Sequence, residues 1–467
     1  MTDLVIIVNG TEADMDTIEV INRYDRQERI PSWNQDKLRN AKIAIFGSSY
    51  LSNFLSASLA ALGIGKIRVY DDEKVDEKFK QGKLEKIASS INPLINFLRI
   101  NNGSESLLPC FLDNPNMIIF ATNKSRVLSS YKSLIEKMPL YSTIPVYVVR
   151  SNKDSAFFSR HVSKHNYQTR EEQEPITSEV ITGFLVGEIV KNLMFNSSLD
   201  FLKYSFNEER FSLKDKKVER KIKLERLDDK KIFLVGAGAL ANFFGIGLTY
   251  ANVGKIYIAD NDKIEPTNLN RQILFYERVG TPKADVLAER LNEINSDIYI
   301  EPIKERINEN SESLISSIKP DLIAECVDNL ATRAILNHLA IRYGIPLVSG
   351  GTNYEKGQVV VYEPGKSLCL NCRLNIDEAA SKGLKARSCM DDPEPSVVTT
   401  NHIIGSLMAA ETRCVLDKEN YSKPIRQRIR YDSTSPLRVG LIGTNESCSC
   451  TRNKSAVEWI QELLEEK

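Results

Sequence analysis

The sequence predicts an α/β protein made of two tandem domains, each built around a mainly parallel sheet. Residues 231–283 have the pattern of a buried strand, a glycine-rich turn, a helix and a second strand that ends in an acid, Asp260. Residues 42–71 repeat this pattern without a gap, and Gly47 and Gly236 stand 189 residues apart. A repeat of this extent indicates that a whole domain is present twice.

The glycine-rich turn of the second copy has the pattern of a nucleotide phosphate site. Gly236, Gly238 and Ala239 allow a tight turn and a close approach of the backbone to a ligand. The helix that follows offers free N–H groups and a positive dipole end to a phosphate. Asp260 can hold ribose hydroxyls. By itself this pattern suits an NAD-dependent dehydrogenase equally well.

Three charged residues downstream favour ATP over NAD. Arg271, Lys283 and Asp328 follow the acid in the second copy, and hydride transfer has no need of them. An enzyme that attacks the α-phosphate of ATP would use both cations to neutralise the leaving pyrophosphate, and Asp328 to hold magnesium. Asn268 and Gln272, which flank Arg271, complete the predicted ATP site.

These pieces resemble the superfamily of ATP-dependent activating enzymes for ubiquitin-like proteins, which includes the MoeB/ThiF-type sulfur-carrier adenylyltransferases. The matching motifs are GAGALA, the aspartate of IADND, NLNRQ, GTPK and CVDN. The resemblance covers residues from about 24 to 450. It implies two Rossmann-like, ThiF-type domains that face each other as an intramolecular pseudo-dimer.

The first copy lacks the residues of the predicted ATP site. Its second and third turn positions are serines, and Gly82 stands where the second copy has Arg271. Thr122, at the end of a predicted strand over 117–123, is expected where the second copy has Asp328. We therefore predict that the first copy is an inactive adenylation domain. The alternative is two active domains, the first with a phosphate clamp made of other residues.

Arg26 belongs to a Tyr-x-Arg-Gln segment that occurs ahead of the first copy and not ahead of the second. In the family that the chain resembles, an arginine of such a segment crosses into the ATP site of the facing domain. The resemblance therefore implies that Arg26 acts near the γ-phosphate of ATP bound to the second domain. The alternative is an ordinary surface ion pair.

Four cysteines form two close pairs that suit a structural zinc site. Cys369 and Cys372 form a C-x-x-C motif after a predicted strand, and Cys448 and Cys450 form a C-x-C motif late in the chain. Four thiolates can close a tetrahedral zinc site. The family carries a similar site, usually with C-x-x-C in both halves. A redox dithiol is the alternative for the first pair.

Cys389 lies in a polar, loop-like segment before a predicted helix, where Arg387 and the helix N-terminus would favour a thiolate. In related enzymes a loop here carries the cysteine that accepts the activated carboxyl terminus as a thioester, which makes Cys389 the candidate nucleophile. Some sulfur-carrier relatives only adenylate and need no such cysteine, and a bystander cysteine is the other alternative. About 30 residues separate Cys372 from Gly405, too few for a large catalytic-cysteine domain.

The predicted organisation has four parts. They are a leader over 1–23, the inactive domain over 24–211, a charged linker over 212–229, and the active domain over 230–467. The last part carries the zinc site, the short catalytic-cysteine loop and a C-terminal helix over 456–465. That helix has Trp459, Ile460, Leu463 and Leu464 on one face, which predicts packing. His402, in the helix after Cys389, is expected at the helix surface.

Composition limits the setting. The 467 residues carry a formal net charge of zero, so nothing predicts bulk attraction to nucleic acid or an anionic membrane. No apolar run is long enough to span a membrane, and the short apolar run at the start lacks the flanking lysines of a secretory signal. A cytoplasmic protein is expected. Eight cysteines in a chain of this size do not form a disulfide framework.

The predicted function is ATP- and magnesium-dependent adenylation of the C-terminal carboxylate of a ubiquitin-like protein with a flexible Gly-Gly tail. A thioester on Cys389 and transfer to a conjugating enzyme would follow. The first alternative is a sulfur-carrier or peptide adenylyltransferase without a thioester. A binding scaffold with a vestigial nucleotide site is the second, and an NAD-dependent dehydrogenase is the third.

Overall fold

The structure is a computed structural model. It describes residues 4–8, 18–47, 49–70, 88–100, 110, 113–122, 125–137, 142–152, 154–160, 174–206, 210–214, 227–385, 394–416 and 424–465. Most of the predicted linker, residues 215–226, lies outside this description, and so does Gly82. The side chain of Leu464 lies outside it as well.

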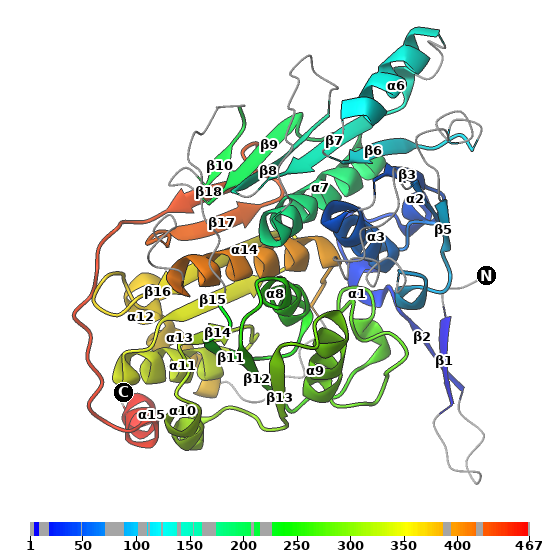
Figure 1. Ribbon diagram of the computed structural model, residues 1–467. Helices are drawn as coiled ribbons and strands as arrows, with labels where there is room; N and C mark the ends of the chain where they lie inside the picture. The colour runs from blue at the N-terminus through cyan, green and yellow to red at the C-terminus, as the bar shows by residue number, and fades with distance from the viewer. Residues whose placement is uncertain are drawn as a thin grey trace.

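Two eight-stranded sheets organise the described chain, and they have the same topology (Figure 1). The strand order is β10-β9-β8-β7-β6-β3-β4-β5 in the first sheet and, in the reverse direction, β13-β12-β11-β14-β15-β16-β17-β18 in the second. Five neighbouring strands of each sheet are parallel, β5-β4-β3-β6-β7 in the first and β13-β12-β11-β14-β15 in the second. The other three strands of each sheet add to β7 and β15 in antiparallel pairs. The predicted duplication of an α/β domain is therefore confirmed at the level of strand order and direction.

The strand bounds follow the chain. In the first sheet they are β3 (Lys42–Phe46), β4 (Lys66–Tyr70), β5 (Asn96–Ile100), β6 (Met117–Ala121), β7 (Val146–Ser151), β8 (Ser155–Ser159), β9 (Phe201–Ser205) and β10 (Phe211–Ser212). In the second they are β11 (Lys231–Val235), β12 (Lys255–Ala259), β13 (Tyr299–Ile303), β14 (Leu322–Glu325), β15 (Leu347–Thr352), β16 (Lys356–Tyr362), β17 (Arg428–Asp432) and β18 (Val439–Ile442). Near the N-terminus, β1 (Leu4–Val8) and β2 (Ile18–Asn22) form an antiparallel pair.

The central strands form because apolar residues occupy both faces. On β11, Ile232 and Leu234 belong to one hydrophobic core, and Phe233 and Val235 to another on the opposite face. A strand covered on both faces is read in sequence as a continuous apolar run. The repeat extends to strand register, because Lys42 pairs with Lys66 and Lys231 pairs with Lys255.

The strand register corrects one sequence-based alignment. Phe46 pairs with Phe120 in the first sheet, and Val235, its equivalent, pairs with Glu325 in the second. Phe120 and Glu325 are therefore equivalent, 205 residues apart, and the same offset places Thr122 opposite Val327. The expectation that Thr122 takes the place of Asp328 is wrong by one residue. The sequence position equivalent to Asp328 is residue 123, which lies outside the described residues.

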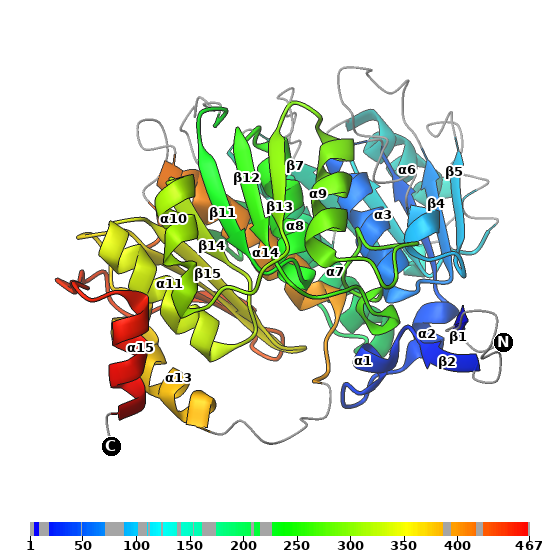
Figure 2. The ribbon, with the colours of Figure 1, turned by 90° about the horizontal axis from the view of Figure 1, so that it is seen from below.

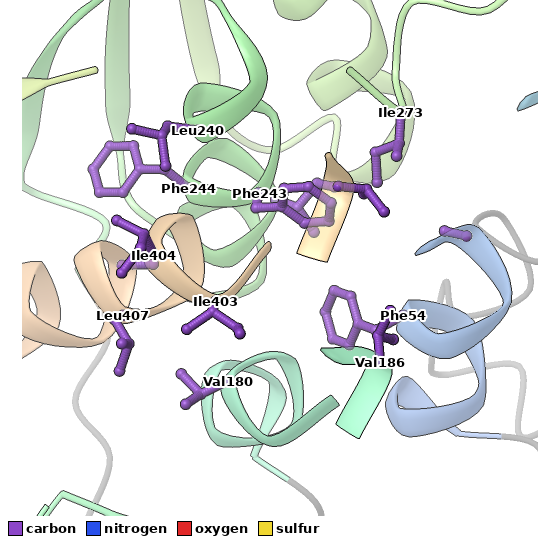
Figure 3. Close-up of a cluster of buried hydrophobic side chains, with 14 of the residues drawn as sticks. Phe54, Val180, Val186, Leu240, Phe243, Phe244, Ile273, Ile403, Ile404 and Leu407 are labelled. Carbon is purple, nitrogen blue, oxygen red and sulfur yellow. The ribbon is translucent and has the colours of Figure 1, made fainter. Parts of the chain in front are cut away.

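Four helices join the two halves, and they lie between the sheets (Figures 1 and 2). They are α3 (Tyr50–Leu62) and α7 (Pro175–Phe195) of the first half, and α8 (Ala239–Tyr250) and α14 (Val398–Leu416) of the second. Every residue of α3 is buried, as is nearly every residue of α14. Figure 3 shows Phe54 and Val180 from the first half facing Phe243 and Ile403 from the second.

His402 of α14 is fully buried, so the prediction of a helix-surface histidine is wrong. Its ring stacks on Phe243 with centroids 4.4 Å apart, and its Nδ1 lies 2.9 Å from Ser58 Oγ on α3. Burial lowers the pKa of His402 to about 3, so the ring is neutral near pH 7. The helix is covered by α3 and α7 of the first half and by α8, β15 and β16 of the second, so His402 is not exposed.

Two ion pairs cross the interface in a reciprocal arrangement. Arg210, just before β10, binds Glu411 of α14 at 2.9 Å, and both side chains are fully buried. Arg438, just before β18, binds Glu188 of α7 at 2.7 Å. The carboxylates also accept backbone N–H groups from the segments before β17 and β9, those of Ile425 and Leu199. Each half thus offers an arginine and receives one, as at an interface with twofold symmetry.

The remaining helices follow in chain order. They are α1 (Asp25–Glu28), α2 (Gln35–Arg39), α6 (Ser125–Lys137), η3 (Pro266–Asn268), α9 (Lys283–Ile294), η4 (Glu309–Ser311), α10 (Glu312–Ile318), α11 (Leu330–Tyr343), α12 (Leu370–Leu374), α13 (Ile376–Lys385) and α15 (Ala456–Glu465). The predicted packing of the C-terminal helix is confirmed, because Trp459 of α15 stacks on the buried His338 of α11. No helix among the described residues is long and apolar enough to cross a membrane.

Candidate functional site

A cavity of about 610 Å³ lies where strands β11, β12 and β14 end, in the second half. Carboxyl ends of parallel strands are the usual ligand site of an open α/β sheet. All ten residues predicted to form the ATP site or to act on ATP line this cavity. They are Arg26, Gly236, Gly238, Ala239, Asp260, Asn268, Arg271, Gln272, Lys283 and Asp328.

The glycine-rich turn shapes one wall of the cavity. Gly236 has a φ of +90°, and a Cβ there would lie 2.7 Å from the carbonyl oxygen of Cys326. The turn therefore requires glycine at this position. Gly238 is the N-cap of α8, and a Cβ there would meet nothing within 4 Å. The open space in front of the helix N-terminus can take a ligand, and the free N–H groups favour an anion.

Asp260 follows β12 and binds the turn. Its Oδ2 accepts the N–H of Ala237 at 2.6 Å, and its Oδ1 accepts the N–H of Asp262 at 2.7 Å. Burial raises the pKa of this carboxyl, and the two N–H groups oppose that rise. Asp260 thus fixes the turn against the second strand while it lines the cavity.

Arg271 and Lys283 approach the cavity from adjacent segments. Arg271 is largely buried, and its Nη1 donates to the carbonyl of Thr267 at 2.7 Å and to Asn270 Oδ1 at 2.9 Å. Burial, with the nearby charge of Arg26, lowers its pKa to about 10. Lys283 begins α9, and its Nζ lies 3.0 Å from Asp262 Oδ2. Both cations line the cavity, where they can bind an anionic ligand.

Two amides beside Arg271 also face the cavity. Asn268 Oδ1 accepts the N–H of Glu265 at 3.0 Å, which closes the short helix η3. Gln272 is buried, and its Oε1 has no hydrogen-bond partner among the described residues. The NLNRQ motif therefore contributes a structural cap and a cation, together with an amide whose oxygen is available to a ligand.

Arg26 reaches the cavity from the first half. It lies on α1, and its Nη1 donates to the carbonyl of Glu394 at 3.0 Å, while its own carbonyl accepts the N–H of Ser396. The neighbouring Gln27 Oε1 accepts from Asn270 Nδ2 at 3.3 Å. The N-terminal helix is thus bound on two sides to the second half, and it places Arg26 at the edge of the cavity.

Asp328 lines the cavity between two fixed neighbours. Asn329 caps α11, because its Oδ1 accepts the N–H of Thr332 at 2.8 Å. On the other side, the N–H of Val327 donates to Glu325 Oε1 at 3.1 Å. Among the described residues none donates to the Asp328 carboxylate, so it is free to bind a cation. A carboxylate oxygen suits magnesium.

The sequence did not predict three further residues around Asp328. Glu325, Ser349 and Arg333 form a buried polar group, and Arg333 also lines the cavity. Burial raises the pKa of Glu325, and the charge of Arg333 opposes that rise. The available signal was the glutamate that ends the otherwise apolar strand LIAE. A buried acid in such a strand calls for a cationic partner.

Cys389 lies outside the described residues, so the structure does not place the candidate nucleophile. The described chain resumes at Glu394, and residues 394–396 line the cavity. Ser396 is held there by the backbone of Arg26 and by Asn270, whose Nδ2 donates to the Ser396 carbonyl at 3.1 Å.

The four cysteines of the predicted zinc site lie together, and we call them the cysteine tetrad. The sulfur atoms of Cys369, Cys372, Cys448 and Cys450 all lie within 4.8 Å of one another. A tetrahedral site with Zn–S bonds of about 2.3 Å requires S–S separations of roughly 3.8 Å. The tetrad therefore fits zinc, and the C-x-C spacing brings Cys450 into the cluster.

Comparison with known proteins places the chain in a family. Residues 208–450, about half of the chain, match the ThiF family model, and the chain belongs to this family. It is similar to the sulfur carrier protein adenylyltransferase of Thermus thermophilus, with 34% identity over 41% of this chain and 71% of that protein. The sulfur carrier protein ThiS adenylyltransferase of Escherichia coli is 32% identical over 30% of this chain and 56% of that protein.

The adenylyltransferase and sulfurtransferase MOCS3 of Aedes aegypti is 32% identical over 42% of this chain. The match spans 43% of the MOCS3 length, so the chain corresponds to less than half of that relative. Among solved structures, E. coli MccB with ATP matches 48% of this chain and 67% of its own, with 27% identity and a TM-score of 0.41.

Proposed function

We propose that this protein binds ATP and magnesium in its second half and adenylates the C-terminal carboxylate of a small carrier protein of the ubiquitin-like class. The observation that carries the proposal is the cavity at the carboxyl ends of the strands, which collects a glycine turn, the cations Arg26, Arg271 and Lys283, and the free carboxylate Asp328. The names of the relatives, adenylyltransferases for sulfur carrier proteins, support it.

In the proposed reaction, a carboxylate oxygen of the carrier attacks the α-phosphorus of ATP. The bond from the α-phosphorus to the bridging oxygen breaks, and pyrophosphate leaves with the electron pair. Arg271, Lys283 and Arg26 bind the negative charge that moves onto pyrophosphate. Asp328 would hold magnesium, which would supply further neutralisation of the phosphate charge. The N–H groups at the start of α8 orient the phosphates, and Asp260 binds the ribose.

We also propose that the two halves form an intramolecular pseudo-dimer with one working site. The shared strand topology and the reciprocal ion pairs support this arrangement. Arg26 supports the division of labour, because it extends from the first half to the cavity of the second. The first half then serves as a scaffold that lends one arginine.

The cysteine tetrad is proposed to hold structural zinc. Cys369 caps α12 and Cys372 lies in it, whereas Cys448 and Cys450 lie in the segment between β18 and α15. The metal would therefore tie the C-terminal segment to the second sheet. Structural zinc sites contribute directly to folding energy.

The thioester step remains a separate part of the proposal. If Cys389 accepts the acyl group, its thiolate attacks the acyl adenylate and AMP leaves, and a conjugating enzyme then takes the acyl group. The alternative is a sulfur-carrier or peptide adenylyltransferase, in which the acyl adenylate passes directly to another acceptor. The relatives named for sulfur carriers favour this alternative.

The test is pyrophosphate exchange into ATP, with magnesium and small ubiquitin-like proteins from the same genome. Wild type should exchange, and Arg271→Ala should lose roughly 10²- to 10³-fold in rate. Arg278→Ala is the matched control, because Arg278 is exposed and pairs with Glu289 away from the cavity. No exchange with any carrier, together with no binding of ATP, would leave a binding scaffold. NADH binding in place of ATP would restore the dehydrogenase.

A non-reducing gel of the same reaction separates the two acyl-transfer schemes. A band that shifts to the size of the conjugate, disappears with dithiothreitol and is absent in Cys389→Ala supports the thioester. Exchange that is unchanged in Cys389→Ala, without any such band, supports direct transfer of the adenylate.

A further inference from the structure

A buried acid supports the segment that carries Asp328. Glu325 ends β14 and is fully buried. One oxygen, Oε1, lies 3.1 Å from Arg333 Nη2 and accepts the N–H of Val327 at 3.1 Å. The other, Oε2, accepts the hydroxyl of Ser349 on the neighbouring strand β15. Both oxygens are therefore engaged, and both fix groups beside the cavity.

Arg333 holds the same segment from the opposite side. Its Nη2 donates to the carbonyl of Val327 at 2.8 Å and to the carbonyl of Gly350 at 3.0 Å. Val327 is thus held through its N–H by Glu325 and through its carbonyl by Arg333. Asp328 follows immediately, and Asn329 is fixed as the cap of α11. The backbone on each side of Asp328 is restrained, while its carboxylate stays unbound by described residues.

The first half shows that the fold does not require this polar trio. By strand register, Phe120 is equivalent to Glu325, and Val148 is equivalent to Ser349. The offset of 205 residues that joins Phe120 to Glu325 also joins Leu128 of α6 to Arg333 of α11. Phe120 and Val148 belong to one hydrophobic cluster, and Leu128 packs against it.

The same three positions therefore hold an apolar trio in the half whose turn and clamp residues are missing, and a polar trio in the half with the cavity. A buried ion pair is a poor source of stability, and apolar replacements of similar volume are often neutral or stabilising. Retention of the polar trio beside Asp328 thus points to a role in the site.

We propose that Glu325 is a positioning residue that, through Arg333 and Ser349, fixes the Val327–Asn329 segment so that Asp328 holds the divalent cation of the nucleotide complex. The inference rests on the proposed function, because it concerns the same cavity. In other metal sites, substitution of a residue that orients a metal ligand lowers metal affinity or activity about 10- to 100-fold.

The test transplants the apolar trio of the first half into the second, as Glu325→Phe/Ser349→Val/Arg333→Leu. The triple variant should fold with a melting temperature at or above that of wild type. Its magnesium concentration for half-maximal pyrophosphate exchange should rise about 10- to 100-fold. Glu325→Gln keeps the shape of the side chain and loses its charge, so it should raise this magnesium concentration by a smaller factor. This variant tests the role of Glu325 if the triple variant fails to fold.

Glu312→Gln is the control, because Glu312 of α10 forms an ion pair away from the cavity with Arg342 of α11, the helix that also carries Arg333. It should leave the magnesium requirement unchanged. If wild type exchanges pyrophosphate and the folded variants keep the wild-type magnesium requirement, the positioning role is wrong and the proposed function stands. If wild type neither exchanges pyrophosphate nor binds ATP with magnesium, both the function and the inference are overturned.

Discussion

The reciprocal ion pairs make a sharp prediction about how the two halves are held together. Arg210 and Glu411 are fully buried, and they join the hairpin of one half to α14 of the other. Burial opposes the charge of Arg210, but Glu411, Cys414 and Tyr204 together outweigh burial, so the pKa of Arg210 is raised. Glu411→Gln should therefore leave a buried guanidinium without its counter-charge, which costs about 3–5 kcal/mol.

The expected shift in melting temperature depends on the unit that unfolds. At about 2.1 cal/mol/K per residue, the unfolding entropy of the whole chain is roughly 1 kcal/mol/K. The loss then lowers Tm by about 3–5 °C if the chain unfolds as one unit, and by about twice that if one half unfolds alone. Differential scanning calorimetry measures both the shift and the number of transitions.

The double variant Arg210→Met/Glu411→Leu is the control, since it removes both charges and keeps most of the volume. It should recover most of the stability or exceed wild type. The equivalent change Glu188→Gln should cost less, because Arg438 is 9% exposed where Arg210 is fully buried. A Glu411→Gln variant that melts within 1 °C of wild type would show that the pair does not stabilise the interface.

Three further predictions concern the site, the cysteine tetrad and pH. Arg26→Ala should slow pyrophosphate exchange about 10²-fold or more at unchanged Tm, whereas exposed Arg29→Ala should not; equal rates would remove Arg26 from the site. Cys450→Ser should lose bound zinc in elemental analysis and lower Tm, and retention of one zinc per chain would contradict the tetrad. Because burial lowers the pKa of His402 to about 3, the unfolded chain binds more protons below pH 6.5, so stability should fall as pH drops from about 6.5 toward 3, by at most about 1.4 kcal/mol per unit. His402→Gln should reduce the fall in Tm between pH 6.5 and 5, and an unchanged fall would refute this assignment.

The cavity residues were predictable because their signals are local. The turn at Gly236 and the acid at Asp260 lie within one strand-turn-helix-strand unit. The other motifs follow in chain order at the ends of neighbouring strands. Parallel strands bring such ends to one edge, so a list of motifs becomes a cavity. Arg26 came from the resemblance, and the contact of α1 with residues 394–396 now gives it a physical place.

His402 and the alignment of Thr122 show where local patterns fail. The polar residues at the start of α14 have the pattern of an exposed helix end, but helices of both halves and the second sheet pack against it. The alignment of Thr122 was off by one residue because the pairing of neighbouring strands sets which residues stand opposite each other. The sequence does not show this pairing.

The sequence by itself determined the duplicated α/β architecture, the glycine turn, the cations that line the cavity and the two cysteine pairs. Each depends on residues close in the chain or on a repeat along it. Only the tertiary structure decided that Glu325, Ser349 and Arg333 form one group, and that Arg210 and Arg438 exchange partners between the halves. These contacts join residues from different strands and helices. A buried charge needs a partner that lies close to it in the folded chain, and the spacing of residues in the sequence does not show which residue that is.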